Sequence, residues 1–201
     1  MLHLLELLAV ITSALFGVLL ARSKQMDFVG VLSVAYIVAF GGGTLRDVLL
    51  DRRPLFWIEH EHYAWIVFGL AIAGTLMPRW PAHLDRWLYL PDALGLGLFG
   101  VVGAGIALGA GTSMFIASLF GVMTGTFGGV IGDIVVNEVP SLFKPTTPLY
   151  ATCAFTGCWA YLLLRLAGTG EPVALWAGVV IVIAMRLAAL KWGITLPAAR
   201  G

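Results

Sequence analysis

Long apolar runs separated by short polar stretches are the feature that most constrains this chain. Hydrophobic residues make up 60% of the 201 positions and charged residues 11%, whereas soluble domains carry about 25% charged residues. Seven runs approach the roughly 20 residues that a helix needs to cross a bilayer. They are Leu2–Leu20, Phe28–Leu50, Tyr63–Met77, Leu88–Leu108, Met114–Val136, Leu149–Leu166 and Val173–Trp192. We therefore predict an all-α integral membrane protein, a single membrane domain over 1–201 with seven transmembrane helices.

The first six runs repeat a pattern of small and acidic residues at a shift of 86 positions. The matched pairs are Gly42-Gly43 with Gly128-Gly129, Asp47 with Asp133, Glu6 with Asp92 and Pro54 with Pro140. Each copy holds three runs, an odd number, so the second copy must enter the membrane in the opposite orientation. The shift therefore predicts two inverted three-helix repeats, over 1–80 and 85–168, followed by a seventh helix over 172–192.

Glycines in the second and fifth runs indicate where a helix can bend. Each glycine costs about 1 kcal/mol of helix stability relative to alanine. In inverted-repeat membrane proteins, broken helices of the two halves meet near the midplane, where their freed backbone groups bind ions or substrates. We expect five glycines to bend these helices around a permeation path: Gly41, Gly42, Gly43, Gly128 and Gly129. The alternative is that they serve close helix packing alone.

Polar residues beside the glycines are candidates for the lining of this path or for a latch across it. They are Thr44, Arg46, Asp47, Asp133, Asn137 and Glu138. Arg46 is matched by Gly132, so the first copy alone keeps a cation beside its acid. Asp133 could pair with Arg46 across the pseudo-twofold axis, or with Arg186, which lies inside the seventh run and needs a partner or water. For all these charges, the alternative is that they reach the membrane interface.

Other titratable residues have simpler explanations. Glu6 and Asp92 stand near helix starts, where the helix dipole favours acids, and a role in a pore vestibule is equally open. His60 and His62 lie in a loop, which favours solvated charge over a metal site, and His3 carries no pattern. We expect no metal and no cofactor.

Loop charges predict the orientation of the chain in the membrane. Seven basic residues gather on one side and three on the other: Arg22, Lys24, Arg79, Arg86, Lys144, Lys191 and Arg200 against Arg52, Arg53 and Arg165. The positive-inside rule then places the N-terminus outside and the C-terminus in the cytoplasm. The formal net charge of +1 gives no reason to expect nucleic acid as a partner.

The doubled motif also resembles a known family. GGGTLRDVLL and GGVIGDIVVNEVPSLF look like the paired signatures of the bacterial branch of the trimeric intracellular cation (TRIC) channel family, also known as a bacterial glycine-transporter-domain family. MRLAAL, around Arg186, resembles the last span of that family. The resemblance implies a homotrimer in the cell membrane of a prokaryote, with one pore per protomer. It implies passage of monovalent cations, chiefly potassium, and bound lipid as a further candidate ligand.

Carried over residue by residue, the resemblance makes the five glycines named above the kinks of the pore helices. It makes Arg46, Asp47 and Asp133 the charges of the family motif. Gly132 departs from the pattern, because the second copy of the family motif often has arginine there. This departure leaves the second half of the chain less positive.

Two function classes remain open and a third is disfavoured. The first is a potassium channel without covalent chemistry. The second is a carrier for glycine or another small neutral amino acid, for which Arg46 with Asp47 or Asp133 could bind the carboxylate and the ammonium group. An enzyme is not expected, because the chain has neither an HExxH nor a G-x-S-x-G motif.

Overall fold

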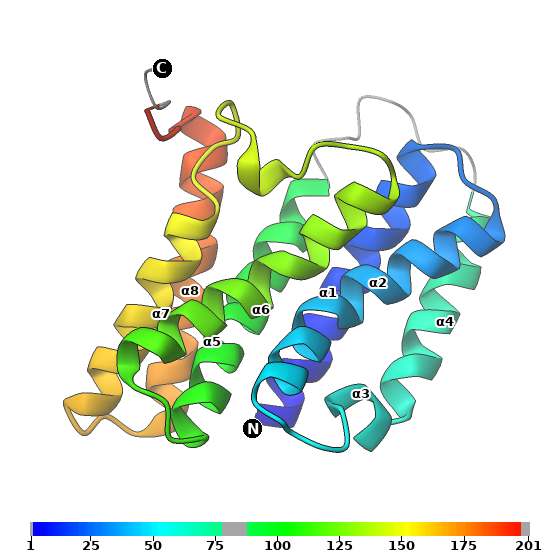
Figure 1. Ribbon diagram of the computed structural model, residues 1–201. Coiled ribbons are helices and arrows are strands. Elements are labelled where there is room, and N and C mark those ends of the chain that lie inside the picture. Colours follow the sequence, from blue (N-terminus) through cyan, green and yellow to red (C-terminus); the bar gives the residue numbers. More distant parts are fainter. Residues whose placement is uncertain (1, 78–87, 198–201) are drawn as a thin grey trace.

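The computed structural model describes residues 2–77 and 88–197, whose helices pack into one bundle (Figure 1). These ranges contain eight α-helices, one short 3-10 helix and no β-strand. In chain order they are α1 (Leu2–Ser23), α2 (Phe28–Leu49), α3 (Phe56–Glu59), α4 (His62–Leu76), α5 (Tyr89–Gly109), α6 (Met114–Val135), η2 (Ser141–Phe143), α7 (Ala151–Leu166) and α8 (Glu171–Trp192). The all-α prediction is confirmed.

Seven of the eight helices in the described ranges coincide with the predicted apolar runs. Five of them, α1, α2, α5, α6 and α8, are long and apolar enough to cross a membrane by length and composition. Helices α4 and α7 are apolar but have 15 and 16 residues. The remaining helix, α3, has four residues and was not predicted. The repeat boundaries at 80 and 85 fall within 78–87, outside the described residues.

The two halves begin their central helices in the same way. The Asp27 side chain caps α2 by accepting a hydrogen bond from the Gly30 amide at 2.9 Å. The Ser113 hydroxyl, 86 positions later, caps α6 by accepting one from the Ile116 amide at 3.3 Å. Each cap satisfies an amide that the first helical turn leaves without a partner.

The same two helices also end alike. Asp51 and Asn137, again 86 positions apart, have left-handed φ angles of 50° and 60°. The amide after each donates at 2.8 Å to the carbonyl oxygen of an acid in the last turn: Arg52 to Asp47, and Glu138 to Asp133. Figure 1 shows α2 and α6 running in opposite directions. The sequence repeat is therefore matched by a repeat of local structure in antiparallel copies.

Helices α2 and α6 cross at their glycines. A Cβ at Gly42 would collide with the carbonyl oxygen of Thr124, and a Cβ at Gly128 would collide with that of Val38. These two contacts are reciprocal, because the shift of 86 carries Gly42 onto Gly128 and Val38 onto Thr124. Both helices continue through their glycines without interruption. Close packing, the alternative considered from the sequence, is what these contacts show; a bend stays a prediction.

Helix α8 has no counterpart in the first half. It packs against α5 and α7, and glycines allow the close approach: a Cβ at Gly178 would lie 2.9 Å from the carbonyl oxygen of Gly157. A Cβ at Gly97 would similarly lie 3.2 Å from that of Val179. This packing brings Arg186 of α8 beside Asp92 of α5.

Candidate functional site

Three buried charged side chains, Glu6, Arg46 and Asp47, form what we call the first charge centre. The Arg46 Nε lies 2.8 Å from Asp47 Oδ1, and its Nη2 lies 3.4 Å from Glu6 Oε1. Arg46 and Asp47 have side chains 0% exposed, and Glu6 is 2% exposed. Asp47 Oδ2 also accepts a hydrogen bond from the Phe56 amide at 2.9 Å. Such a group is stable only while its members satisfy one another.

Aromatic side chains enclose the first charge centre. The guanidinium of Arg46 lies 5.3 Å from the centroid of the Phe56 ring. Phe56 is fully buried and contacts the rings of Phe40 and Tyr63, while Trp57 stacks on Phe40. The indole N–H of Trp57 donates to the Thr44 hydroxyl at 3.0 Å, which places Thr44 in this packing. We call Phe40, Phe56, Trp57 and Tyr63 the aromatic cluster.

Asp92, Tyr150 and Arg186 form the second charge centre. Arg186 Nη2 lies 3.4 Å from Asp92 Oδ2, and the Tyr150 hydroxyl donates to Asp92 Oδ1 at 2.7 Å. Arg186 Nη1 donates to the carbonyl oxygens of Pro148 and Leu149 at 2.7 and 3.0 Å. The guanidinium also lies over the Tyr150 ring, 4.5 Å from its centroid. Arg186 thus holds the segment before α7 against α5; a latch across a permeation path stays a prediction.

Asp133 differs from the prediction. Its Oδ2 accepts a hydrogen bond from the Ser141 amide at 2.7 Å, the counterpart of the bond between Asp47 and Phe56. Within the described part of the chain, it forms an ion pair with neither Arg46 nor Arg186. The two arginines have Glu6 and Asp47, and Asp92, as their partners, so the predicted pairings of Asp133 are wrong.

A cavity of about 420 Å³ adjoins the second charge centre. It lies at the end of the bundle where α1 finishes, α5 begins and η2 lies, which is the upper end in Figure 1. Its polar wall contains Asp92, Asp133, Lys144, Tyr150 and Arg186, and Gly129 lines it from α6. A separate void of about 10 Å³ lies at the crossing, where Ser13, Thr124 and Gly128 line it, and shares Asp92, Gly129 and Tyr150 with the wall of the cavity. The open space is therefore much smaller at the crossing of α2 and α6 than at the end of the bundle.

The sequences of the two halves explain why the cavity lies in the second. The shift of 86 replaces Phe40 by Thr126, Phe56 by Leu142, Trp57 by Phe143 and Tyr63 by Leu149. The second half thus has one aromatic ring where the first has four. Leu142 lines the cavity, whereas Phe56 fills the equivalent place in the first half and is 0% exposed.

Asn137 and Glu138 lie at the outer end of α6 rather than on the narrow part of the cavity. Asn137 is exposed. Glu138 accepts a hydrogen bond from Lys24 and lies 3.5 Å from Lys144 Nζ. The hydrogen bond and charge of Lys24, followed by the charge of Lys144, lower the pKa of Glu138 below its usual 4.5. This group joins the end of α1 to the segments after α6.

Sequence reasoning missed the most informative neighbours of the predicted charges. Tyr150 and the amides of Phe56 and Ser141 carry no motif of their own. Glu6 and Asp92 were noted as acids at helix starts but were not placed beside arginines. Their shared position under the shift of 86 was the signal that could have found them.

A polar cavity that enters an apolar helix bundle and ends at a helix crossing is typical of membrane channels and carriers. A family model described as glycine transporter matches the chain twice, over residues 3–79 and 89–165. These stretches begin 86 positions apart, the shift found in the sequence. The chain belongs to this family, the bacterial branch of the TRIC channel family.

Relatives and solved structures agree with this assignment. The chain is 35% identical to a UPF0126 membrane protein of Vibrio cholerae, over 98% of this chain and 82% of the relative. It is 34% identical to the UPF0126 inner membrane protein YadS of Escherichia coli, over 96% and 93% of the two chains. A TRIC trimeric intracellular cation channel orthologue from Rhodobacter sphaeroides superposes with a TM-score of 0.90 and 35% identity, covering 96% of this chain and 98% of the other.

A second solved structure, which is described as showing the structural basis for conductance through TRIC cation channels, superposes with a TM-score of 0.88 at 29% identity. It covers 98% of this chain and 97% of the other. These structural relatives are channels rather than enzymes.

Proposed function

We propose that this protein is a channel for monovalent cations, chiefly potassium, with seven transmembrane helices. The observation that carries the proposal is the cavity of about 420 Å³, whose wall contains Asp92 and Asp133 together with Lys144 and Arg186, next to a far smaller void at the crossing of α2 and α6. Arg186 is paired with Asp92 and Lys144 with Glu138, so Asp133 is the carboxylate of this wall that remains to attract cations. The solved relatives described as cation channels support this class.

Different residues would have different roles in this channel. Asp133 would attract cations, because its carboxylate lines the cavity and its hydrogen-bond partner is the Ser141 amide rather than a cation. Gly42 and Gly128, at the crossing, would form the constriction, and a bend there would widen it. Gly41, Gly43 and Gly129 would allow that bend.

The remaining predicted residues would support the pore rather than line its narrow part. Arg46 and Asp47 would fix the closed packing of the first half, since their side chains are 0% exposed. Arg186 would latch the segment before α7 to α5. Thr44 would hold Trp57, and Asn137 and Glu138 would lie at the outer rim of the path.

The assembly and orientation of the channel are part of the proposal. We infer a homotrimer with one pore per protomer, because the Rhodobacter sphaeroides relative is described as trimeric. The positive-inside rule places the C-terminal end of the bundle, and hence the cavity, toward the cytoplasm of a prokaryotic cell. Lys24, Lys144 and Lys191 support this orientation; Arg79, Arg86 and Arg200 lie outside the described residues. Potassium would be the permeant ion, membrane lipid a bound partner, and no other cofactor is proposed.

A carrier for glycine or another small neutral amino acid is the second candidate. The family description favours it, and the cavity has both a guanidinium and carboxylates in its wall. In such a carrier, Arg186 would bind the carboxylate of the amino acid and Asp92 or Asp133 its ammonium group. The sequence had suggested Arg46 for this role, but Arg46 is fully buried.

Two reconstitutions of the purified protein separate these candidates. In planar bilayers under a potassium gradient, a channel gives discrete potassium-selective currents, whereas protein-free bilayers give none. In liposomes loaded with unlabelled glycine, a carrier accumulates external labelled glycine by saturable counterflow. Currents without counterflow support the channel, and counterflow without discrete currents overturns it.

A further inference from the structure

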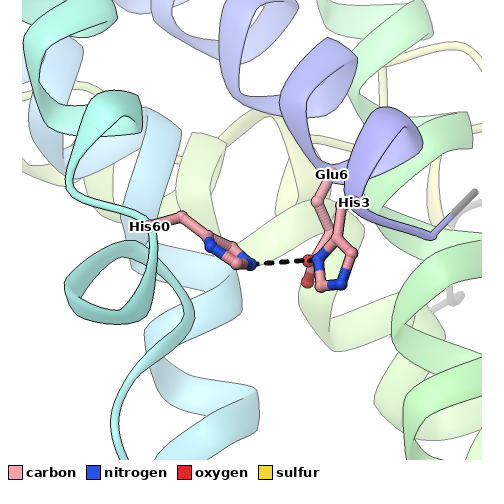
Figure 2. A group of neighbouring side chains, drawn as sticks. All are labelled: His3, Glu6 and His60. Carbon is pink, nitrogen blue, oxygen red and sulfur yellow. Dashed lines mark hydrogen bonds and ion pairs between the residues drawn. The ribbon is translucent and has the colours of Figure 1, made fainter.

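Two histidines and a carboxylate meet at the end of the bundle opposite the cavity. His60 Nε2 lies 3.0 Å from His3 Nδ1, and the same His3 nitrogen lies 3.9 Å from Glu6 Oε2. Figure 2 shows the three side chains converging from α1 and from the turn between α3 and α4. Their ligand atoms all lie within 4.8 Å of one another. We call His3, Glu6 and His60 the histidine cluster.

We propose that the histidine cluster binds a divalent transition-metal ion of the zinc class, with water completing its coordination. Imidazole nitrogen and carboxylate oxygen are ligands that Zn²⁺ prefers, and two histidines with one acid leave an open fourth position. Two nitrogens bound at 2.0–2.1 Å in a tetrahedral site are about 3.3 Å apart. The observed separation of 3.0 Å is therefore close to the bound geometry. Glu6 Oε2, 3.9 Å from His3 Nδ1 and within 4.8 Å of the His60 ligand atom, needs to approach the two histidines by roughly 0.5 to 1.5 Å.

The surrounding residues hold the histidine cluster in place before any ion arrives. The Tyr63 hydroxyl donates to the backbone carbonyl of His3 at 3.1 Å, which fixes the start of α1 against α4. The His60 amide donates to Phe56 O at 3.2 Å, and its carbonyl accepts from the Tyr63 amide at 2.9 Å. The Tyr63 ring also packs edge-on against the His60 ring. Ligands held in this way lose little freedom when a metal binds.

The histidine cluster is open to solvent on one side and anchored in the bundle on the other. The His3 side chain is 67% exposed, so an ion can reach the cluster from solvent, while the Glu6 side chain is 2% exposed. Glu6 Oε1 faces Arg46, and Glu6 Oε2 faces His3. Glu6 would therefore link the metal to the first charge centre, as outer groups link a metal ligand to its surroundings.

The proposal is tested by titrating the purified full-length protein, free of any histidine tag, with Zn²⁺ in competition with a chromophoric chelator. We expect one ion per chain in the wild type, and binding at least about tenfold weaker, or 1.4 kcal/mol, in His3→Asn and in His60→Asn. The matched control is His62→Asn, because His62 packs beside His60 but is not part of the cluster. It should bind as tightly as the wild type.

Two further measurements keep the test decisive. Thermal unfolding of each variant without metal shows whether it folds, and Zn²⁺ should raise the Tm of the wild type and of His62→Asn but not that of His60→Asn. Co²⁺ added in place of Zn²⁺ should give the intense visible absorption of a four-coordinate ion. The proposal would be overturned if the wild type bound no stoichiometric Zn²⁺. It would also be overturned if folded His3→Asn and His60→Asn bound Zn²⁺ as tightly as the wild type.

Discussion

The two halves of the bundle place an acid, an arginine and an aromatic ring in related positions, yet the two centres differ in origin and surroundings. In the first half the cation is Arg46, on the same helix as Asp47. In the second half that position is Gly132, and Arg186 reaches Asp92 from α8. One sequence motif, copied and inverted, thus forms a closed charge cluster in one half and part of a cavity wall in the other.

The difference follows from side-chain volume as well as charge. Phe40, Phe56, Trp57 and Tyr63 fill the space around the first charge centre. The smaller Thr126, Leu142 and Leu149 stand at three of the equivalent positions. Asp133, the counterpart of Asp47, follows Gly132 rather than an arginine in the sequence and lines the cavity together with Lys144 and Arg186. We therefore assign stability to the charges of the first half and cation attraction to Asp133 in the second.

The largest expected effect is that of Arg46→Met. Removing the cation leaves Glu6 and Asp47 buried without compensation, and breaking a buried pair in this way costs about 3–5 kcal/mol. Arg186→Met should cost less, because Asp92 is 11% exposed beside the cavity whereas Glu6 is 2% exposed. Unfolding in detergent measures both losses. Equal losses in the two variants would remove the difference between the charge centres.

Alanine substitutions at the helix crossing test the symmetric part of the comparison. Gly42→Ala and Gly128→Ala should each lose about 1–3 kcal/mol of stability, because each new Cβ meets a backbone carbonyl that cannot move aside. Gly129→Ala is the matched control, since its Cβ would lie 3.4 Å from the nearest atom, the Tyr150 hydroxyl oxygen. In thermal unfolding, Gly129→Ala should have the Tm closest to that of the wild type. A loss at Gly129 as large as that at Gly128 would contradict the crossing geometry.

Leu142→Phe gives the second half the same residue type that the first half has at the equivalent position, Phe56. The added ring should enter the cavity that Leu142 lines, lowering single-channel conductance while changing stability by less than about 1 kcal/mol. Single-channel recording and thermal unfolding of the same preparation check the two parts. Leu119→Phe is a control, because this residue is 44% exposed on α6. An unchanged conductance in Leu142→Phe would place the ion path elsewhere.

The smallest expected effect concerns Glu138 at the outer end of α6. Lys24 and Lys144 lower its pKa below 4.5, so its contribution to stability is present above that value and lost as the pH falls through the lowered pKa. Glu138→Gln should lower the Tm slightly at pH 7 and converge on the wild type in acid. Salt should reduce the difference at pH 7, because the pair is at the surface. A Tm difference between the wild type and Glu138→Gln that grows as the pH falls would contradict this prediction.

The sequence predicted the helices far better than the contacts of their charges. Apolar runs fixed the positions of α1, α2 and α4 to α8 because membrane-length helices are set by local composition. The partners of the charges depend on packing between distant segments. Glu6 lies 40 positions before Arg46, and no local pattern predicts that pairing.

Backbone groups explain the other failures. Asp133 binds the Ser141 amide, and Arg186 binds two carbonyl oxygens before α7. Every residue has an amide or a carbonyl, so the sequence does not indicate which of these groups will face a charge. The cavity was equally hidden, although the loss of aromatic residues between the two copies, as from Phe56 to Leu142, was visible in the sequence.

Asp47→Asn and Asp133→Asn, compared in one set of recordings, separate the roles of the two halves. The two variants remove the same charge from equivalent positions, one fully buried against Arg46 and one in the cavity wall. The account predicts that Asp133→Asn lowers potassium conductance while keeping the Tm near that of the wild type. We expect Asp47→Asn to lower the Tm, while the channels that still fold keep the single-channel conductance of the wild type. Reversed effects, or an unchanged conductance in Asp133→Asn, would contradict the account.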